Sequence, residues 1–156
     1  MDKPLICKRS VQVYFFYFIT LTYWFSLYVY SPYFSPYVES LGASHSLTGL
    51  ILGSYGLTAV FFRLPFGIIS DRLQRRKIFV ALGMILSGIS CLGFWLTSTP
   101  VTALLFRAVA GISASAWVVF AVQFAGYFER DKAANAMSTL NAFCSLGQMT
   151  ATFSGG

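Results

Sequence analysis

The sequence predicts an all-α protein, a polytopic membrane helix bundle, and its composition is the first reason. Hydrophobic residues make up 56% of the 156 residues, charged residues only 10%, and the mean hydropathy is +0.67. A typical soluble domain is about 45–50% apolar and about 25% charged, so these few charges do not cover a water-exposed surface of this size. The composition therefore excludes a soluble enzyme, a nucleic-acid-binding module and a disordered chain.

Five apolar runs are each long enough to cross a bilayer, whose hydrocarbon core of about 30 Å requires roughly 20 helical residues. In chain order they cover about residues 11–38, 47–70, 78–97, 101–128 and 133–156. The breaks between them, at 42–46, 71–77, 98–100 and 129–132, are rich in glycine, serine and charged residues. Pro100 stands where the fourth run begins, a helix position that tolerates its missing N–H. Residues 1–156 are therefore expected to form one unit of five transmembrane helices.

Basic residues mark one side of the membrane. They are Lys3, Lys8 and Arg9 before the first run, Arg72, Arg75, Arg76 and Lys77 between the second and third, and Arg130 and Lys132 between the fourth and fifth. The other two connections contain no Lys or Arg. Because basic loops stay in the cytoplasm, the N-terminus is expected on the cytoplasmic side of the cell (plasma) membrane.

Groups of residues that carry catalysis or bind metals do not occur in the sequence. His45 is the only histidine, and the three cysteines are scattered without a C-x-x-C spacing. There is no glycine-rich phosphate loop, no Ser-His-Asp set and no pair of carboxylates. We therefore expect no enzyme activity, cofactor, metal or nucleic-acid partner.

Small residues four positions apart recur along the runs: Gly49 and Gly53, Gly83 and Ser87, Ala110 and Ala114, and Gly111 and Ser115. In lipid, small residues hold helices together because they let two backbones approach closely. Their presence on several runs indicates a compact bundle in which these pairs lie at helix contacts.

The segment after the second run reads Gly67-Ile68-Ile69-Ser70-Asp71-Arg72-Leu73-Gln74-Arg75-Arg76-Lys77. It resembles the signature loop of the major facilitator superfamily, G-x-x-S/A-D-R-x-G-R-R/K, which lies between the second and third helices of that family. Gln74 stands where the family favours glycine. The resemblance implies that five residues form a cytoplasmic gate motif: Gly67, Asp71, Arg72, Arg75 and Arg76. It implies that Asp71 bonds to neighbouring arginines and to a helix N-terminus in a second half; the alternative is a helix-ending residue in a solvated loop.

Two further segments resemble motifs of the same family. Arg107, followed by Gly111, resembles the arginine motif of its fourth helix. Residues 147–156 resemble the antiporter motif G-x-x-x-G-P-x-x-G-G on its fifth helix, with Ala151 in place of a glycine and Thr152 in place of the proline. The small residues of this stretch, Gly147, Ala151, Gly155 and Gly156, are expected to pack against a helix absent from the chain.

The family consists of transporters with twelve or more helices in two six-helix halves. The resemblance implies that this chain is the first five helices of a major-facilitator-type six-helix half, and we expect it to be a fragment. It further implies secondary active transport of a small solute by alternating access, with the lipid bilayer, an unidentified small-molecule substrate and the missing C-terminal half as partners. A small membrane scaffold or subunit and a small oligomeric exporter are the alternatives. An exporter of that kind relies on a membrane-embedded carboxylate, which no run contains.

Several polar residues inside the runs are candidates for a substrate cavity. Arg107 lies about 10 Å into its helix, where a charge either faces a cavity or extends to the surface. Arg63, about 12 Å from the end of its helix, allows the same two interpretations equally. Tyr30 is the best cavity candidate on a tyrosine-rich face, while Asn141 and Gln148 belong to a polar stripe on the fifth run. Substrate, coupling ion and direction of transport stay open.

Overall fold

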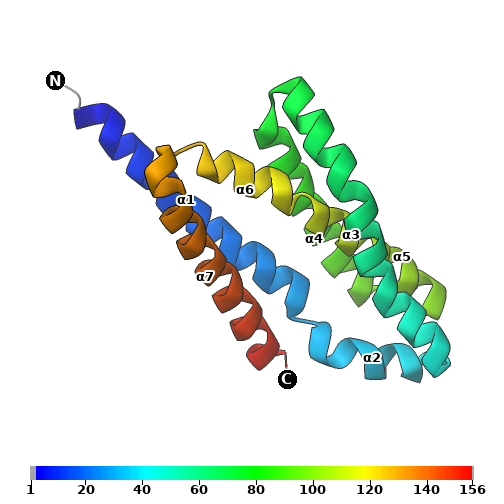
Figure 1. Ribbon diagram of the computed structural model, residues 1–156. Helices are drawn as coiled ribbons and strands as arrows, with labels where there is room; N and C mark the ends of the chain where they lie inside the picture. The colour runs from blue at the N-terminus through cyan, green and yellow to red at the C-terminus, as the bar shows by residue number, and fades with distance from the viewer. Residues whose placement is uncertain (1–2, 156) are drawn as a thin grey trace.

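The structure, a computed structural model, describes the backbone of residues 3–155 and the side chains of residues 11–155. This part of the chain is all α-helical, as predicted (Figure 1). Its helices are α1 (Lys3–Tyr28), α2 (Ser31–Ser40), α3 (His45–Leu73), α4 (Arg76–Trp95), α5 (Pro100–Ser115), α6 (Trp117–Ala125) and α7 (Arg130–Ser154). The five predicted helices appear as seven because the first and the fourth are each interrupted once.

Four stretches of the described chain are long and apolar enough to cross a membrane: Val11–Ser40, His45–Leu73, Arg76–Trp95 and Pro100–Ala125. The expectation of a fifth apolar run at 133–156 needs correction. Its 25 helical residues span roughly 37 Å, enough to cross, but α7 is too rich in polar side chains to reach the same hydropathy. Several of its hydroxyls donate to a carbonyl one turn earlier, as Thr139 does to Asn135 and Thr152 to Gln148, so these polar groups are satisfied within the helix.

The first interruption separates α1 from α2 at residues 29–30. Pro32 lies at the first turn of α2 and has no N–H to continue the hydrogen-bond ladder of α1. The second part of the first span therefore turns away from α1, and Tyr30 lies at the break.

The second interruption, at Ala116, separates α5 from α6 without a proline or glycine. Ser113 compensates for it. Its carbonyl accepts the Ala116 N–H at 3.0 Å and the Tyr23 hydroxyl at 2.6 Å, and its own hydroxyl donates to the Gly83 carbonyl at 2.7 Å. Since lipid offers no partners to backbone groups, these bonds from α1 and α4 keep a broken helix tolerable inside the membrane.

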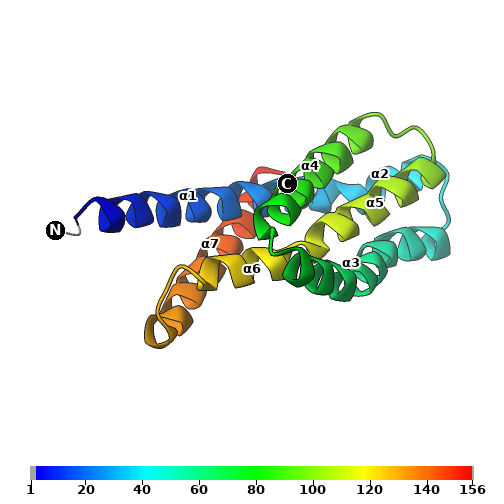
Figure 2. The same ribbon diagram turned by 90° about the horizontal axis from the view of Figure 1, so that it is seen from above.

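The helices pack as two groups joined by α6. Helix α7 lies along α1, while α3 and α4 lie against α5, and α6 crosses from the second group to the first (Figures 1 and 2). The core between the groups is aromatic: Trp24 of α1 meets Trp117 of α6 edge-to-face, with ring centroids 5.3 Å apart. The α3–α4 and α6–α7 connections, with the arginines and lysines in them and in the adjoining helix turns, lie at one end of the bundle, which we name the basic end.

Candidate functional site

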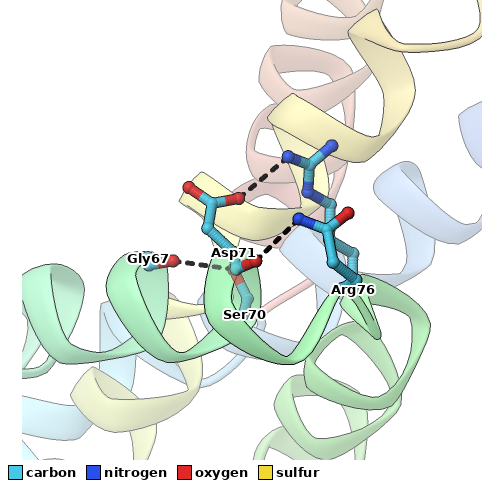
Figure 3. Close-up of polar contacts among 5 residues, drawn as sticks. Gly67, Ser70, Asp71 and Arg76 are labelled. Carbon is cyan, nitrogen blue, oxygen red and sulfur yellow. Dashed lines mark hydrogen bonds and ion pairs between the residues drawn. The ribbon is translucent and has the colours of Figure 1, made fainter.

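The loop at the basic end joins the last turn of α3 to the first turn of α4 (Figure 3). A carboxylate oxygen of Asp71 accepts a hydrogen bond from the Arg76 guanidinium at 2.8 Å, and the Ser70 hydroxyl donates to the Gly67 carbonyl at 2.9 Å. The side chain of Asp71 is 62% exposed and that of Arg76 is 35% exposed. A pair so open to solvent contributes at most about 1 kcal/mol to stability, so its effect is to orient Asp71. Arg72 and Arg75 are exposed and form no ion pair with any described residue.

Gln74 takes the left-handed conformation at the end of α3, with φ 52° and ψ 21°. It is the only residue other than glycine with a positive φ in the part of the chain that the structure describes. A side chain costs about 1–2 kcal/mol there, because its Cβ crowds the following carbonyl. Its amide nitrogen donates to the Asp71 carbonyl at 2.7 Å, which closes the turn.

We expect the Gln74→Gly variant to be more stable than Gln74→Ala by about 1 kcal/mol. Both variants lack the side-chain amide, so the comparison isolates the cost of a Cβ in the left-handed conformation. Thermal unfolding of the two detergent-solubilised proteins, followed by circular dichroism, should show unfolding temperatures about 2–4 °C apart. Equal unfolding temperatures would mean that this turn relaxes without strain.

Arg107 of α5 lies among three aromatic rings. Its guanidinium carbon is 5.6 Å from the ring centroid of Tyr30, 5.1 Å from that of Phe34 and 4.7 Å from that of Tyr55. One terminal nitrogen donates to the Tyr30 hydroxyl at 3.1 Å, whereas the buried Nε has no hydrogen-bond partner among the described residues. We call Arg107 and these three rings the arginine cage.

The cage explains how the charge is tolerated without an acid. All five acidic residues of the sequence lie outside the apolar runs or at their ends, at Asp2, Glu39, Asp71, Glu129 and Asp131. A mid-membrane arginine costs about 2.5–3.5 kcal/mol on insertion scales. Each cation–π contact contributes about 0.5–2 kcal/mol, so three rings offset a cost of this size. The unpartnered Nε leaves a hydrogen-bond donor in the cage.

Gly111, one turn after Arg107, sets the distance between α5 and α3. A Cβ at this position would overlap the Tyr55 carbonyl oxygen and the Thr58 hydroxyl. That hydroxyl lies 3.0 Å from the Ala108 carbonyl oxygen of α5 and 2.8 Å from the Ser54 carbonyl oxygen of its own helix, so its hydrogen is shared between the two helices. Because Tyr55 belongs both to this contact and to the cage, the close approach at Gly111 also places its ring over Arg107.

Tyr30 connects the cage to a cavity. The cavity has a volume of 410 Å³ and is lined by Val29, Tyr30, Tyr33, Phe34, Tyr37, Cys91, Phe94 and Trp95. The Tyr30 ring packs on Phe94 of α4 with centroids 4.4 Å apart, while its hydroxyl binds Arg107. Tyr30 and Phe34 therefore line the cavity and also form two walls of the cage.

The structure does not bring the other candidate polar residues to this place. Arg63 is exposed on α3, and Asn141 is exposed on α7. Gln148 is half-buried, and its amide nitrogen lies 3.4 Å from the Cys144 sulfur. Neither Asn141 nor Gln148 lines the cavity at Tyr30. Phe34 was expected only as an alternative member of the tyrosine-rich face, and Tyr55 was not expected at all, since no spacing along the chain links either ring to Arg107.

The small residues of α7 pack against α1, which corrects the expectation of a partner outside the chain. A Cβ at Gly147 would lie 2.6 Å from the Leu21 carbonyl oxygen, and one at Gly155 would overlap the Val29 carbonyl. Ala151 between them is fully buried. Gly156 lies outside the described residues.

A family model described as Major Facilitator Superfamily matches residues 16–156. The chain belongs to the major facilitator superfamily. As a member it is a multi-pass membrane protein of a transport family, and α7 lies within the matched region although it is less apolar than the other spans.

The chain covers less than half the length of each of three curated relatives that it matches. It is 28% identical over 150 residues, 96% of its length, to an uncharacterized MFS-type transporter of Methanocaldococcus jannaschii, of which it covers 39%. It is 49% identical over 39 residues, 25% of its length, to 9% of the inner membrane transport protein YajR of Escherichia coli. An uncharacterized transporter of Buchnera aphidicola is 35% identical over 81 residues, 52% of this chain and 20% of that protein. No solved structure matches the chain significantly.

Proposed function

We propose that the chain is part of a secondary transporter that moves a small solute across the cell membrane by alternating access, without enzymatic chemistry. The observation that carries this proposal is the arginine cage: a cation about 10 Å into a membrane-spanning stretch that, within the described chain, pairs with no acid and has no hydrogen-bond partner at Nε. Intramembrane charges of this kind usually mark a substrate or ion pathway. Tyr30 and Phe34 belong both to the cage and to the lining of the cavity, although Arg107 itself does not line it.

An unpartnered face of α3 supports a second half as the partner. A Cβ added at Gly49, Gly53, Gly56 or Gly67 would have no atom within 4 Å, and at 100° per residue all four glycines lie within an arc of about 60° around the helix. Asp71 falls on the same arc. Gly49 and Gly53 therefore contact no other helix in the described part of the chain. A glycine face is what close packing of another membrane helix requires, so we assign it to the second half, with Asp71 at its end as the gate residue.

The transport proposal is tested with the complete product of the gene in proteoliposomes. The vesicles are loaded with a mixture of labelled sugars, amino acids, organic anions and organic cations, and a proton or sodium gradient is imposed. Saturable, gradient-dependent flux of one solute class supports the proposal. Flux no greater than in protein-free vesicles for every class and either gradient contradicts it.

We further propose that the basic end faces the cytoplasm, because basic connections stay inside. Single cysteines introduced by Ser44→Cys and Ser98→Cys, on a background without native cysteines, are expected to react with a membrane-impermeant maleimide from outside intact cells. The Gln74→Cys variant is expected to react only after the cells are opened. Labelling of Gln74→Cys in intact cells, with protection of the other two, would reverse the orientation.

A further inference from the structure

A hollow at the basic end is lined by three basic side chains together with uncharged ones. Its volume is 440 Å³, and it is lined by Gln74, Arg75, Arg76, Lys77, Ile78, Gln123, Gly126 and Tyr127. Arg76 pairs with Asp71, but within the described chain Arg75 and Lys77 form no ion pair. Among the described residues no acid lines the hollow, so the unpaired charge there is positive.

A second hollow, of 240 Å³, continues the first toward the middle of the membrane. It is lined by Gln12, Phe15, Phe16, Ile19, Lys77, Val80, Gln123 and Tyr127. The two share Lys77, Gln123 and Tyr127, and the Gln123 amide donates to the Tyr127 hydroxyl at 3.2 Å. From Gln12 to Ile19 the second hollow follows α1 for about 10 Å, and its deeper wall is formed by the rings and aliphatic side chains of Phe15, Ile19 and Val80. Together they form one groove, cationic at the end of the bundle and apolar inside, which we name the head–tail groove.

We propose that the head–tail groove binds one anionic phospholipid from the leaflet at the basic end. The phosphate lies between Arg75 and Lys77, the glycerol and ester region at Gln123 and Tyr127, and one acyl chain beside Phe15, Ile19 and Val80. Basic pockets between membrane helices bind anionic head groups by this charge complementarity. A free phosphate would leave the apolar part unused, and an apolar helix would leave Arg75 and Lys77 without a counter-charge. The groove thus selects an acidic phospholipid over the neutral phospholipids of the surrounding bilayer.

The test measures retention of phosphatidylglycerol and of phosphatidylcholine by native mass spectrometry, with the complete gene product released from detergent micelles containing both lipids in equal amounts. We expect one phosphatidylglycerol to be retained in preference to phosphatidylcholine. The double variant Arg75→Gln/Lys77→Gln should weaken this retention about tenfold or more, since each basic residue near the surface contributes measurably to binding of acidic lipid. The double variant Arg130→Gln/Lys132→Gln removes the same charge at the same end, outside the groove, and should retain the lipid as the wild type does.

Two further measurements distinguish a bound lipid from other occupants of the groove. Val80→Trp fills the apolar hollow and should reduce phosphatidylglycerol retention at an unchanged unfolding temperature, whereas glycerol phosphate at the same concentration should not displace the lipid. The proposal is overturned if both double variants lose the lipid equally, if the groove variant keeps it, if Val80→Trp has no effect, or if glycerol phosphate displaces it. Equal retention of the two lipids, or none of either, overturns it as well, because the groove is then unselective or covered by protein.

Discussion

Replacement of Gly111 by alanine is expected to lower the unfolding temperature of the protein by about 5–10 °C. The added Cβ would overlap the Tyr55 carbonyl and the Thr58 hydroxyl. A backbone carbonyl cannot move aside as a flexible side chain does, so α3 has to separate from α5. Overpacking of this kind costs about 1–3 kcal/mol, and separation of the two helices would also break the contact of the Thr58 hydroxyl with the Ala108 carbonyl.

The matched control for this variant is Gly88→Ala in α4, where no atom lies within 4 Å of the added Cβ. Alanine is favoured over glycine inside a helix by about 0.5–1 kcal/mol, so the control should melt at or slightly above the wild-type temperature. Melting is followed by circular dichroism of the detergent-solubilised proteins. If Gly111→Ala also melts at the wild-type temperature, the spacing of α3 and α5 does not depend on this glycine.

Four of the five spans were predictable from composition, because the bilayer requires long apolar helices and most basic residues lie at the helix ends and connections. The interruption at 29–30 also has a local cause in Pro32. The interruption at Ala116 has no such local cause. It depends on hydrogen bonds that Ser113 makes with Tyr23 and Gly83, which lie 90 and 30 positions away in the sequence. A one-dimensional pattern therefore gives one long fourth helix where the structure has α5 and α6.

The spacing of small residues in the sequence is also an incomplete guide to helix contacts. Gly49 with Gly53 and Gly111 with Ser115 have identical spacing in the sequence, yet of these glycines only Gly111 touches another helix within the described chain. The pattern indicates that a helix face permits close approach and does not reveal which helix approaches. For the same reason the small residues of α7 were predictable as a packing face, whereas their partner α1 was not.

The contacts of the candidate site likewise fall into one that follows from the sequence and others that depend on the folded chain. Asp71 and Arg76 are five residues apart on either side of one turn, so their ion pair follows from local geometry. The arginine cage instead collects rings from α2 and α3, 73 and 52 positions before Arg107 for Phe34 and Tyr55. An intramembrane arginine in a sequence predicts that partners exist, because the bare charge is costly, but only packing determines that they are aromatic.

Replacement of Arg107 by methionine is expected to reduce solute flux in the proteoliposome assay by about 100-fold, since two charge-assisted hydrogen bonds to a substrate amount to about 3 kcal/mol. Methionine keeps most of the length and bulk of the side chain within the cage of Tyr30, Phe34 and Tyr55, so helix packing is largely preserved. Arg107→Lys keeps the charge but lacks the planar set of donors that includes the free Nε, and we expect flux reduced about tenfold.

The Tyr30→Phe variant separates the guanidinium's role toward a solute from its bond within the protein. It removes the only hydrogen bond that Arg107 makes to another described side chain and leaves the ring in place. If Arg107 acts on the solute, Tyr30→Phe should lower flux far less than Arg107→Met does, at equal expression and equal unfolding temperature. Wild-type flux in Arg107→Met would instead show that the arginine only fills the space between α5, α2 and α3. An equal loss in Tyr30→Phe and Arg107→Met would assign its function to holding the break between α1 and α2.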